Sequence, residues 1–304
     1  MPPRSLLDVD DLTPAELVGV LDRAVSFRDH LPPRDLLAGV PVLNLFFEAS
    51  TRTATSFTLA EQRVGADVIS FAPGASSLGK GETIADTALT LRGIGVRVIV
   101  VRHHESGFAR RLADVFDGHV VNAGDGTHAH PTQALLDLMT LRQEFNRFAG
   151  LRVAIVGDIL HSRVARSNIV GMRALGIDVT LVGPATLLPR EFETNGVKIE
   201  RDLDAILPRV DAVMMLRIQR ERIELGLLPS LEDYTQRYQL NRARLRSLRS
   251  DAVILHPGPY NRGVELTDDV LDDPRSRYVA QVHNGVFVRM AVLDLLVNGA
   301  PVAA

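Results

Sequence analysis

Apolar residues along the chain follow two patterns that alternate from end to end. Short continuous runs, typical of buried strands, end at Phe47 and span residues 67–71, 96–101, 119–122, 151–156, 178–182, 212–216 and 252–255. Between these runs apolar residues recur at helical spacing, which predicts helices over residues 12–27, 51–63, 82–92, 108–116, 131–145, 163–175 and 278–297. Strands that alternate with helices indicate parallel sheets with helices on both faces.

The alternation of strands and helices starts afresh at Gly150. A chain of 304 residues is long for one core and suits two domains of about 150 residues each. We therefore expect an α/β protein of two doubly wound parallel-sheet domains, residues 1–149 and 150–277, with the active site in the cleft between them. A C-terminal helix at about 278–299 is expected to pack back on the first domain.

Composition narrows the class of protein. Hydrophobic residues make up 46% of the chain, no apolar run reaches the roughly 18 residues of a membrane span, and the N-terminus lacks the apolar region of a secretory signal. These features predict a cytoplasmic enzyme that does not bind membranes. The absence of cysteine excludes disulfides, thiolate metal sites and a cysteine nucleophile. The net charge of −3 argues against nucleic-acid binding, so the arginines of residues 234–249 are interpreted as a solvated, mobile loop with a basic helix.

Residues 44–58 contain the first candidate chemistry. An apolar run gives way to a helical pattern through Ser50, Thr51, Arg52 and Thr53. A helix that begins here directs unpaired backbone N–H groups and its positive dipole end at whatever lies above the turn. Three hydroxyls and a guanidinium add donors, so an oxyanion, above all a phosphate, is the expected ligand. The alternative is an ordinary cap, in which Thr51 or Thr53 merely satisfies helix N–H groups.

Polar clusters follow the ends of most predicted strands, which is where ligands bind in doubly wound sheets. These clusters are residues 50–53, Arg102, and residues 125–133, 158–163, 217–219 and 256–259. Two half-sites are therefore expected to face each other across the domain boundary. Several clusters contain an arginine that can bind a carboxylate or phosphate through two parallel hydrogen bonds: Arg52, Arg102, Arg163 and Arg217. For any single arginine the alternative is a surface ion pair, worth about 0 to 1 kcal/mol.

Two motifs resemble nucleotide-binding sequences without completing them. Residues 74–81 nearly match the phosphate-binding loop of NTPases, but Gly81 stands where a magnesium-binding hydroxyl is required. We interpret this stretch as a flexible loop that presents Lys80, with a solvated surface lysine as the alternative. Residues 157–163 follow a strand but lack the later glycines of a dinucleotide fingerprint, which argues against NAD.

The histidines raise the question of a metal site. Asp125, His128 and His130 are close in sequence, as are His103 and His104, but no His-Glu-x-x-His motif is present. We therefore expect no metal. A neutral His130 that donates one hydrogen bond to a substrate carbonyl is the more economical interpretation, with a structural histidine as the alternative.

Together these motifs resemble the aspartate/ornithine carbamoyltransferase family, and within it the aspartate-using branch. The sequence Phe-Glu-Ala-Ser-Thr-Arg-Thr at 47–53 is similar to the family's carbamoyl phosphate motif, and His-Pro-Thr-Gln at 130–133 is similar to its second signature. The resemblance extends from near the N-terminus to the final helix. Aspartate is favoured by residues 216–222 and by the Lys80 loop. It is also favoured by His-Pro-Gly-Pro at 256–259, because ornithine enzymes have His-Cys-Leu-Pro there.

The resemblance implies transfer of the carbamoyl group of carbamoyl phosphate to the amino group of L-aspartate, which gives N-carbamoyl-L-aspartate and phosphate in pyrimidine synthesis. It implies no cofactor, metal or covalent intermediate. Carbamoyl phosphate would be bound by Ser50, Thr51, Arg52, Thr53, Ser76, Arg102, His130, Gln133, Gly258 and Pro259. Aspartate would be bound by Lys80, Arg163, Arg217, Gln219 and Pro257. The catalytic residues would be Arg52, Thr53, Lys80, Arg102 and His130.

The resemblance also implies a homotrimer with shared active sites, in which a serine and Lys80 of the mobile loop reach a neighbouring subunit. Whether regulatory chains or a dihydroorotase join a larger assembly is left open. The chain departs from the family at Ala54, where many relatives have a basic residue, and in having one lysine in the mobile loop, so the partner serine is either Ser76 or Ser77. Two other functions remain open: a carbamoyltransferase for another amino acid, and a non-catalytic subunit that binds phosphate or nucleotide.

Overall fold

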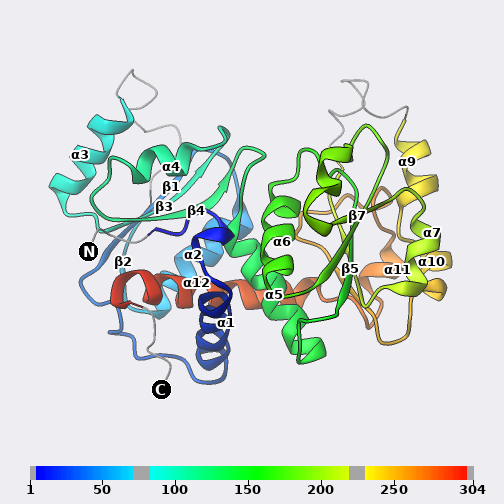
Figure 1. The fold of residues 1–304 in the computed structure, drawn as a ribbon. Coiled ribbons are helices and arrows are strands. Elements are labelled where there is room, and N and C mark those ends of the chain that lie inside the picture. The colour runs from blue at the N-terminus through cyan, green and yellow to red at the C-terminus, as the bar shows by residue number, and fades with distance from the viewer. Residues whose placement is uncertain (1–4, 71–82, 219–229, 300–304) are drawn as a thin grey trace. The chain divides into compact units, whose positions relative to one another are not determined.

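The computed structural model describes residues 5–70, 83–218 and 230–299. The chain forms two compact units, one of residues 1–139 with 282–304 and the other of residues 140–281. Each unit is a parallel sheet with helices against it (Figure 1). The expected α/β class with two parallel-sheet domains is confirmed.

The first unit contains a four-stranded parallel sheet in the order β2-β1-β3-β4. Its strands are β1 (Pro41–Phe46), β2 (Asp67–Ser70), β3 (Val98–His103) and β4 (His119–Asp125). Its helices are η1 (Val9–Asp11), α1 (Pro14–Asp29), α2 (Thr51–Arg63), α3 (Ile84–Ile94) and α4 (Phe108–Ala113). The boundary between the units falls within α5 (Pro131–Phe145) and within α12 (Tyr278–Asn298).

The two faces of this sheet pack against different helices (Figure 1). Leu43 of β1 and Ile99 of β3 belong to a buried core that includes Phe108 of α4. Because side chains alternate along a strand, Asn44 points to the opposite face, where it hydrogen-bonds Glu61 of α2. This packing places the N-terminus of α2 at the carboxyl end of β1.

The second unit contains a five-stranded parallel sheet in the order β7-β6-β5-β8-β9. Its strands are β5 (Arg152–Val156), β6 (Asp178–Val182), β7 (Lys198–Glu200), β8 (Ala212–Met215) and β9 (Val253–Leu255). Its helices are α6 (Arg163–Ala174), η4 (Arg190–Gly196), α7 (Leu203–Ile206), η5 (Leu207–Arg209), α9 (Leu231–Tyr238), α10 (Arg242–Ser247) and α11 (Asp268–Leu271). Helix α6 covers one face, while α7, α9, α10 and α11 lie against the other (Figure 1).

One strand of this unit was missed, and one expectation was wrong. Strand β7 pairs with β6 at the edge of the sheet, but its sequence Lys-Ile-Glu has one apolar residue and so gave no strand signal. The segment 234–249 is not a solvated loop with one helix, because it lies in α9 and α10 and buries Arg244. The guanidinium of Arg244 donates to both oxygens of Asp204 and to two backbone carbonyls, which satisfies most of its donors inside the fold.

Helix α12 is a core helix of the first unit over residues 282–298. By length and composition it could cross a membrane, but 78% of its most apolar window is buried inside the protein, as is usual for a core helix. Its Asp294 carboxylate accepts a 2.7 Å bond from Arg23 of α1, which ties the two ends of the chain together within this unit.

A buried carboxyl group links α2 to β1. Glu61 is fully buried and accepts a 2.6 Å hydrogen bond from Asn44 Nδ2. Burial raises the pKa of Glu61 from 4.5 to about 8, although the Asn44 bond opposes this shift. Among the described residues, Glu61 Oε1 and Asn44 Oδ1 have no hydrogen-bond partner. A protonated carboxyl suits this site because it carries no charge and gains a donor.

We expect Glu61 to make the folded state less stable as pH rises. Between pH 4.5 and about 8 the folded state keeps a proton that the unfolded state has lost. The free energy of unfolding should therefore fall by up to about 1.4 kcal/mol per pH unit in this window and level off above it. Glu61→Gln cannot ionise and offers Asn44 Oδ1 an N–H donor, so it should raise the melting temperature at pH 8.5.

Thermal unfolding at pH 5.5 and 8.5 checks this expectation. Glu232→Gln, which changes an exposed residue of α9, serves as the control and should leave the pH dependence as it is. The same decline with pH in Glu61→Gln and in the unmodified protein would contradict the assignment.

Candidate functional site

Each sheet has a point where the chain reverses its direction of winding. From β1 the chain goes outward to β2 and then returns to β3 on the other side of β1, and β8 follows β6 and β7 around β5 in the same manner. Ligands of doubly wound sheets bind beyond the carboxyl ends of the strands at such points. We call residues 48–53 with Arg102, His130 and Gln133 the β1/β3 site. Residues 157–163, 216–218 and 256–259 form the β5/β8 site.

The N-terminus of α2 is the centre of the β1/β3 site. Ser50 is its N-cap residue, but the Ser50 side chain makes no hydrogen bond to the helix amides. The first backbone bond of the helix runs from Ala54 N–H to Ser50 O at 3.0 Å, so the amides before it remain for a ligand. Thr51 and Arg52 are exposed, whereas Thr53 is buried. This arrangement favours an anion site over an ordinary side-chain cap at Ser50.

Arg102 lies beside this helix end because β1 and β3 are paired, with Phe46 opposite Arg102 in the register. Its Nε lies 3.2 Å from Glu48 Oε2, and its Nη1 donates to Ala123 O at 3.2 Å. The side chain is 14% exposed. These contacts hold the guanidinium at the carboxyl ends of three neighbouring strands.

His130 and Gln133 stand where α5 begins, after β4. His130 is 4% exposed, and its carbonyl accepts the Gln133 N–H at 3.1 Å. Gln133 Nε2 donates to Asp137 Oδ1 at 3.0 Å, one turn further along the helix. Because the Gln133 amide nitrogen is held this way, the orientation of its amide depends on Asp137.

Asp125 organises the loop that leads to His130. Its carboxylate accepts the N–H groups of Gly107 at 2.6 Å and Ala129 at 3.1 Å, and it lies 3.2 Å from His128 Nδ1. Asp125 and His128 therefore serve as structural residues of this loop. The pair needs no metal ion to account for it.

One further group of possible metal ligands, His103, His104 and Glu105, occurs among the described residues, with ligand atoms within 4.8 Å of one another. His103 Nδ1 accepts the Glu105 N–H at 3.0 Å, and the Glu105 carboxylate bonds Arg111. His103 stacks on Phe108 at 3.8 Å, and burial, followed by the His104 charge, lowers its pKa. Stacking and hydrogen bonding account for these side chains.

Arg289 of α12 is a residue that sequence reasoning missed. It is 4% exposed, donates from Nη1 to Ser56 Oγ at 2.8 Å, and lies over the Phe57 ring at 4.9 Å. Burial lowers its pKa to about 10; the Asp137 charge opposes this shift and the Arg102 charge adds to it. A buried cation therefore lies behind α2, near both Asp137 and Arg102. The only sequence signal was one arginine inside the apolar stretch 278–297.

The β5/β8 site combines the ends of three paired strands. Val156 pairs with Met215, and Met214 pairs with Leu255, so the residues that follow these strands lie at one edge of the sheet. Arg217 is exposed at the end of β8. Within the described part of the chain no hydrogen bond or ion pair engages its guanidinium, which leaves it available for a carboxylate.

The turn after β5 leads Arg163 into α6. Asp158 Oδ1 accepts the His161 N–H at 3.1 Å and lies 2.9 Å from His161 Nδ1, and Ser162 caps the helix by accepting the Ala165 N–H at 3.1 Å. Arg163 is the first residue of α6. The helix start thus places this arginine at the same end of the sheet as the turn.

Two glycines allow the backbone of this site to approach closely. Gly157 has φ +129°, and a Cβ there would meet Leu216 Cβ and the Tyr234 hydroxyl at 3.2 Å. Gly258 has φ 65° and donates its N–H to His256 Nδ1 at 2.9 Å. Both conformations lie in the region that favours glycine.

Three residues that the resemblance assigned to the site lie outside the described residues, as does Ser77, the alternative to the first of them: Ser76, Lys80 and Gln219. Their proposed roles stay predictions.

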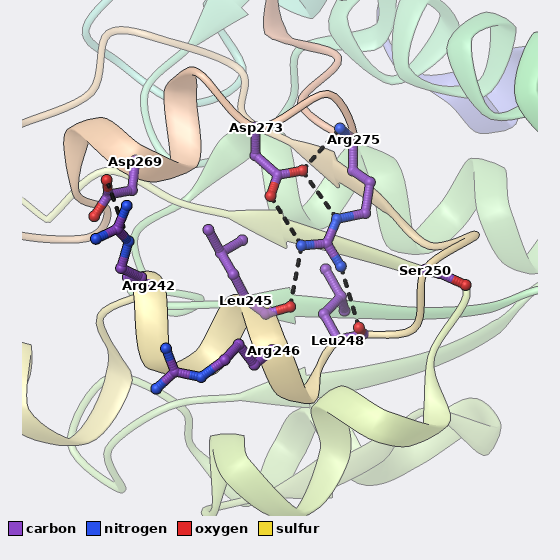
Figure 2. Close-up of a pocket in the computed structure, with 8 residues that line it drawn as sticks. All are labelled: Arg242, Leu245, Arg246, Leu248, Ser250, Asp269, Asp273 and Arg275. Atoms are coloured by element: carbon purple, nitrogen blue, oxygen red, sulfur yellow. Dashed lines mark hydrogen bonds and ion pairs between the residues drawn. The ribbon is translucent and has the colours of Figure 1, made fainter.

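A pocket of about 680 Å³ in the second unit is lined by residues 242–250 and by residues 269–275 (Figure 2). Arg275 donates to both Asp273 oxygens at 2.9 Å and to the carbonyls of Leu245 and Leu248. Arg242 lies 3.7 Å from Asp269. Asp269 and Asp273 thus pair with two of the three arginines that line the pocket, and we assign these two ion pairs a structural role.

Two family models match most of the chain. Residues 4–143 match the carbamoyl-P binding domain of the aspartate/ornithine carbamoyltransferases, and residues 149–296 match their Asp/Orn binding domain.

Curated relatives match nearly the full length. The aspartate carbamoyltransferase catalytic subunit of Acidothermus cellulolyticus is 51% identical over 301 residues, which cover 97% of this chain and 93% of that relative. The subunit of the same name from Salinispora arenicola is 53% identical over 290 residues, covering 94% of this chain and 92% of the relative.

Solved structures share the fold. Aspartate transcarbamoylase from Trypanosoma cruzi, in complex with carbamoyl phosphate and aspartate, has a TM-score of 0.86 and 32% identity over 96% of each chain. Ornithine carbamoyltransferase from Thermus thermophilus also has a TM-score of 0.86, with 28% identity over 97% of this chain and 99% of that one. Likeness of fold therefore does not separate aspartate from ornithine as the acceptor.

We expect Arg289 to support anion binding at the β1/β3 site. Arg289→Met removes the buried cation but keeps a long side chain, so inorganic phosphate should bind about tenfold more weakly, a change of about 1.4 kcal/mol. Arg289→Lys, which keeps the charge, should weaken phosphate binding less. Titration calorimetry with phosphate at low salt measures the effect.

The matched control is Arg23→Met. Arg23 is an arginine of α1 that bonds Asp294 of α12, so the variant removes another arginine contact of the same helix. Its phosphate affinity should stay within about twofold of the unmodified protein, since its partner Asp294 lies more than a helical turn from Arg289. Equal loss of phosphate affinity in both variants, or none in Arg289→Met, would refute a specific role for Arg289.

Proposed function

The chain belongs to the aspartate/ornithine carbamoyltransferase family, and we propose that it transfers the carbamoyl group of carbamoyl phosphate to the amino group of L-aspartate. The products are N-carbamoyl-L-aspartate and phosphate, the committed step of pyrimidine synthesis. One structural observation supports this proposal most directly: the amide end of α2, with no side-chain cap from Ser50, lies at the β1/β3 reversal point beside Arg102. That is a site built for a phosphate group.

Carbamoyl phosphate binds at the β1/β3 site in this proposal. The amides of α2 and the side chains of Ser50, Thr51 and Arg52 hold the phosphate, and Ser76 of a neighbouring subunit adds a donor. Gln133 and Arg102 complete the pocket. The backbone at Gly258 and Pro259 contacts the carbamoyl group.

The chemical step is attack of the amine of aspartate on the carbamoyl carbon. A C–N bond forms, negative charge develops on the carbonyl oxygen, and Thr53, Arg102 and His130 donate hydrogen bonds to that oxygen. As the tetrahedral intermediate collapses, the C–O bond to phosphate breaks, and the departing phosphate accepts the proton of the amine. Preorganised donors of this kind contribute about 3 to 4 kcal/mol each in other acyl-transfer enzymes. Orientation of the two substrates supplies much of the remainder.

Aspartate binds through its two carboxylates at the β5/β8 site. Arg163 and Arg217 take up the charges, with Gln219 and Lys80 as further donors, and the carbonyl of Pro257 orients the amine. The exposed guanidinium of Arg217 suits a second carboxylate, whereas the amino group of ornithine would meet a like charge there. The relatives of about 50% identity that carry the aspartate name support the same choice.

The relatives named as catalytic subunits support an oligomeric assembly. We propose a cytoplasmic homotrimer whose active sites take Lys80 and Ser76 from a neighbouring subunit. Regulatory chains or a dihydroorotase could extend this assembly without changing the chemistry of the trimer.

Comparison of acceptors tests the proposed reaction. Carbamoyl transfer should be fastest with L-aspartate and slow with L-ornithine and N-acetylornithine. Arg217→Ala should raise KM for aspartate by about 100-fold, equivalent to roughly 2.7 kcal/mol of lost carboxylate binding, with little change in KM for carbamoyl phosphate. The control is Arg246→Ala, which removes another exposed arginine of the second unit. Faster turnover with ornithine would replace the aspartate assignment, and no ureido product with any acceptor would favour a non-catalytic binding subunit.

Mixing of variants tests the shared active site. An Arg52→Ala chain and a Lys80→Ala chain, each inactive alone, should regain part of the activity when their subunits exchange. In a mixed trimer some active sites then combine an unmodified Arg52 from one subunit with an unmodified Lys80 from its neighbour. Native mass spectrometry should report a trimer and confirm exchange. Exchange without any recovery of activity would rule out the sharing of Lys80.

A further inference from the structure

A buried carboxylate, Glu265, connects the ends of β8 and β9 in the second unit. Glu265 is fully buried; its Oε1 accepts the Asn261 N–H and lies 3.5 Å from His256 Nε2. The side chain of Asn261 in turn donates from Nδ2 to Ile218 O at 2.7 Å. Through Asn261, the carboxylate of Glu265 is thus linked to both the turn after β9 and the backbone after β8.

The tautomer of His256 follows from its contacts. Its Nδ1 accepts the Gly258 N–H at 2.9 Å, so the neutral ring carries its proton on Nε2, the atom that faces Glu265. The His256 N–H also donates to Gln281 Oε1 at 2.9 Å. The imidazole therefore braces the 256–258 turn through Nδ1 and lies beside Glu265 on its Nε2 side.

Asn261 hydrogen-bonds the backbone just after β8, beyond the last hydrogen bond between β8 and β5. Leu216 N–H donates to Val156 O at 2.8 Å, which is the end of the ladder. Within the described residues, the bond from Asn261 is the hydrogen bond that engages the backbone of residues 217–218. Ile218 is fully buried while its neighbour Arg217 is exposed, so holding the Ile218 carbonyl sets the direction in which Arg217 projects.

The surroundings of Glu265 strengthen these bonds. Tyr234 is fully buried next to Gly157, and burial, together with the charges of Glu265 and Asp158, raises its pKa. Hydrogen bonds in such a low-dielectric interior are stronger and more directional than at the surface. The bonds from Asn261 therefore restrain the backbone of residue 218.

We propose that Asn261 and Glu265 are positioning residues for the amino-acid acceptor. They hold Arg217 in a fixed relation to the Pro257–Gly258 backbone, so that the carboxylate and the amine of the acceptor are located by one rigid framework. The inference rests on the proposed function and adds residues that touch neither substrate. A bidentate arginine contact tolerates little displacement, and a misplacement of about 1 Å can cost up to 100-fold in rate.

The principal test is Asn261→Leu, which removes the Nδ2 donor, keeps the number and branching of side-chain heavy atoms and adds no charge. KM for aspartate should rise about tenfold or more, while KM for carbamoyl phosphate stays within about twofold. Glu265→Gln keeps an acceptor oxygen for the Asn261 N–H and should stay close to the unmodified enzyme, whereas Glu265→Leu should behave like Asn261→Leu.

The matched control is Gln239→Ala. Gln239 Nε2 donates to Gly263 O at 2.7 Å. This variant therefore removes a bond from a side-chain amide to a backbone carbonyl that has the same length as the bond from Asn261 to Ile218 and involves the same stretch of chain, residues 261–263. It should leave both KM values unchanged. Melting temperatures of all variants distinguish a loss of folded stability from a displacement of Arg217 in a stable protein.

The outcomes are distinct. A selective rise of KM for aspartate in Asn261→Leu, absent from Gln239→Ala, supports the positioning role. Equal rises of both KM values, or a lower melting temperature with unchanged KM for aspartate, overturn it. If the unmodified enzyme does not carbamoylate aspartate at all, the proposed function fails first, and this inference fails with it.

Discussion

The parallel direction of the strands is the constraint on which the rest of this protein depends. In a parallel sheet all carboxyl ends lie at one edge, so every turn that leaves a strand there can add a side chain to one site. Phe46 and Arg102 are register partners, as are Val156 and Met215. Residues far apart in sequence thus become neighbours through backbone pairing alone. The turns that follow the strands then need to supply only the binding groups, from side chains or from backbone.

Positive charge gathers near the N-terminus of helix α2, which suits the binding of an anion there. Its N-terminus presents free amides beside Arg102, and the guanidinium of Arg289 lies buried behind it. Further along the same helix, the raised pKa of Glu61 keeps that carboxyl protonated at neutral pH. A neutral Glu61 does not offset the positive potential that an anion meets at the start of the helix. Of the nearby acids, Glu48 lies against the Arg102 guanidinium, and the charge of Asp137 favours the protonated form of Arg289.

Local patterns were sufficient to predict the parts of the site that are local. The end of a strand, a turn with donors and a helix start occur within ten residues, so the clusters around Ser50 and His130 could be recognised from sequence. Arg289 and Asn261 could not, because their partners Ser56 and Ile218 are 233 and 43 residues away. Strand β7 was not predicted for a different reason. It lies at the edge of the sheet, where its stability comes from pairing with β6 and not from apolar side chains.

The place of α12 in the chain has a consequence for the order of biosynthesis. Residues 140–281 form the second unit without interruption, so a ribosome delivers all of that unit before α12 is complete. The first unit begins earlier but needs Arg289, which reaches Ser56 across 233 residues of sequence. Contacts of such long range form late, because the intervening chain must be made and ordered first. The half of the protein translated first is therefore the half finished last, and a chain that stops before residue 282 would have a complete second unit beside an anion site that lacks its buried arginine.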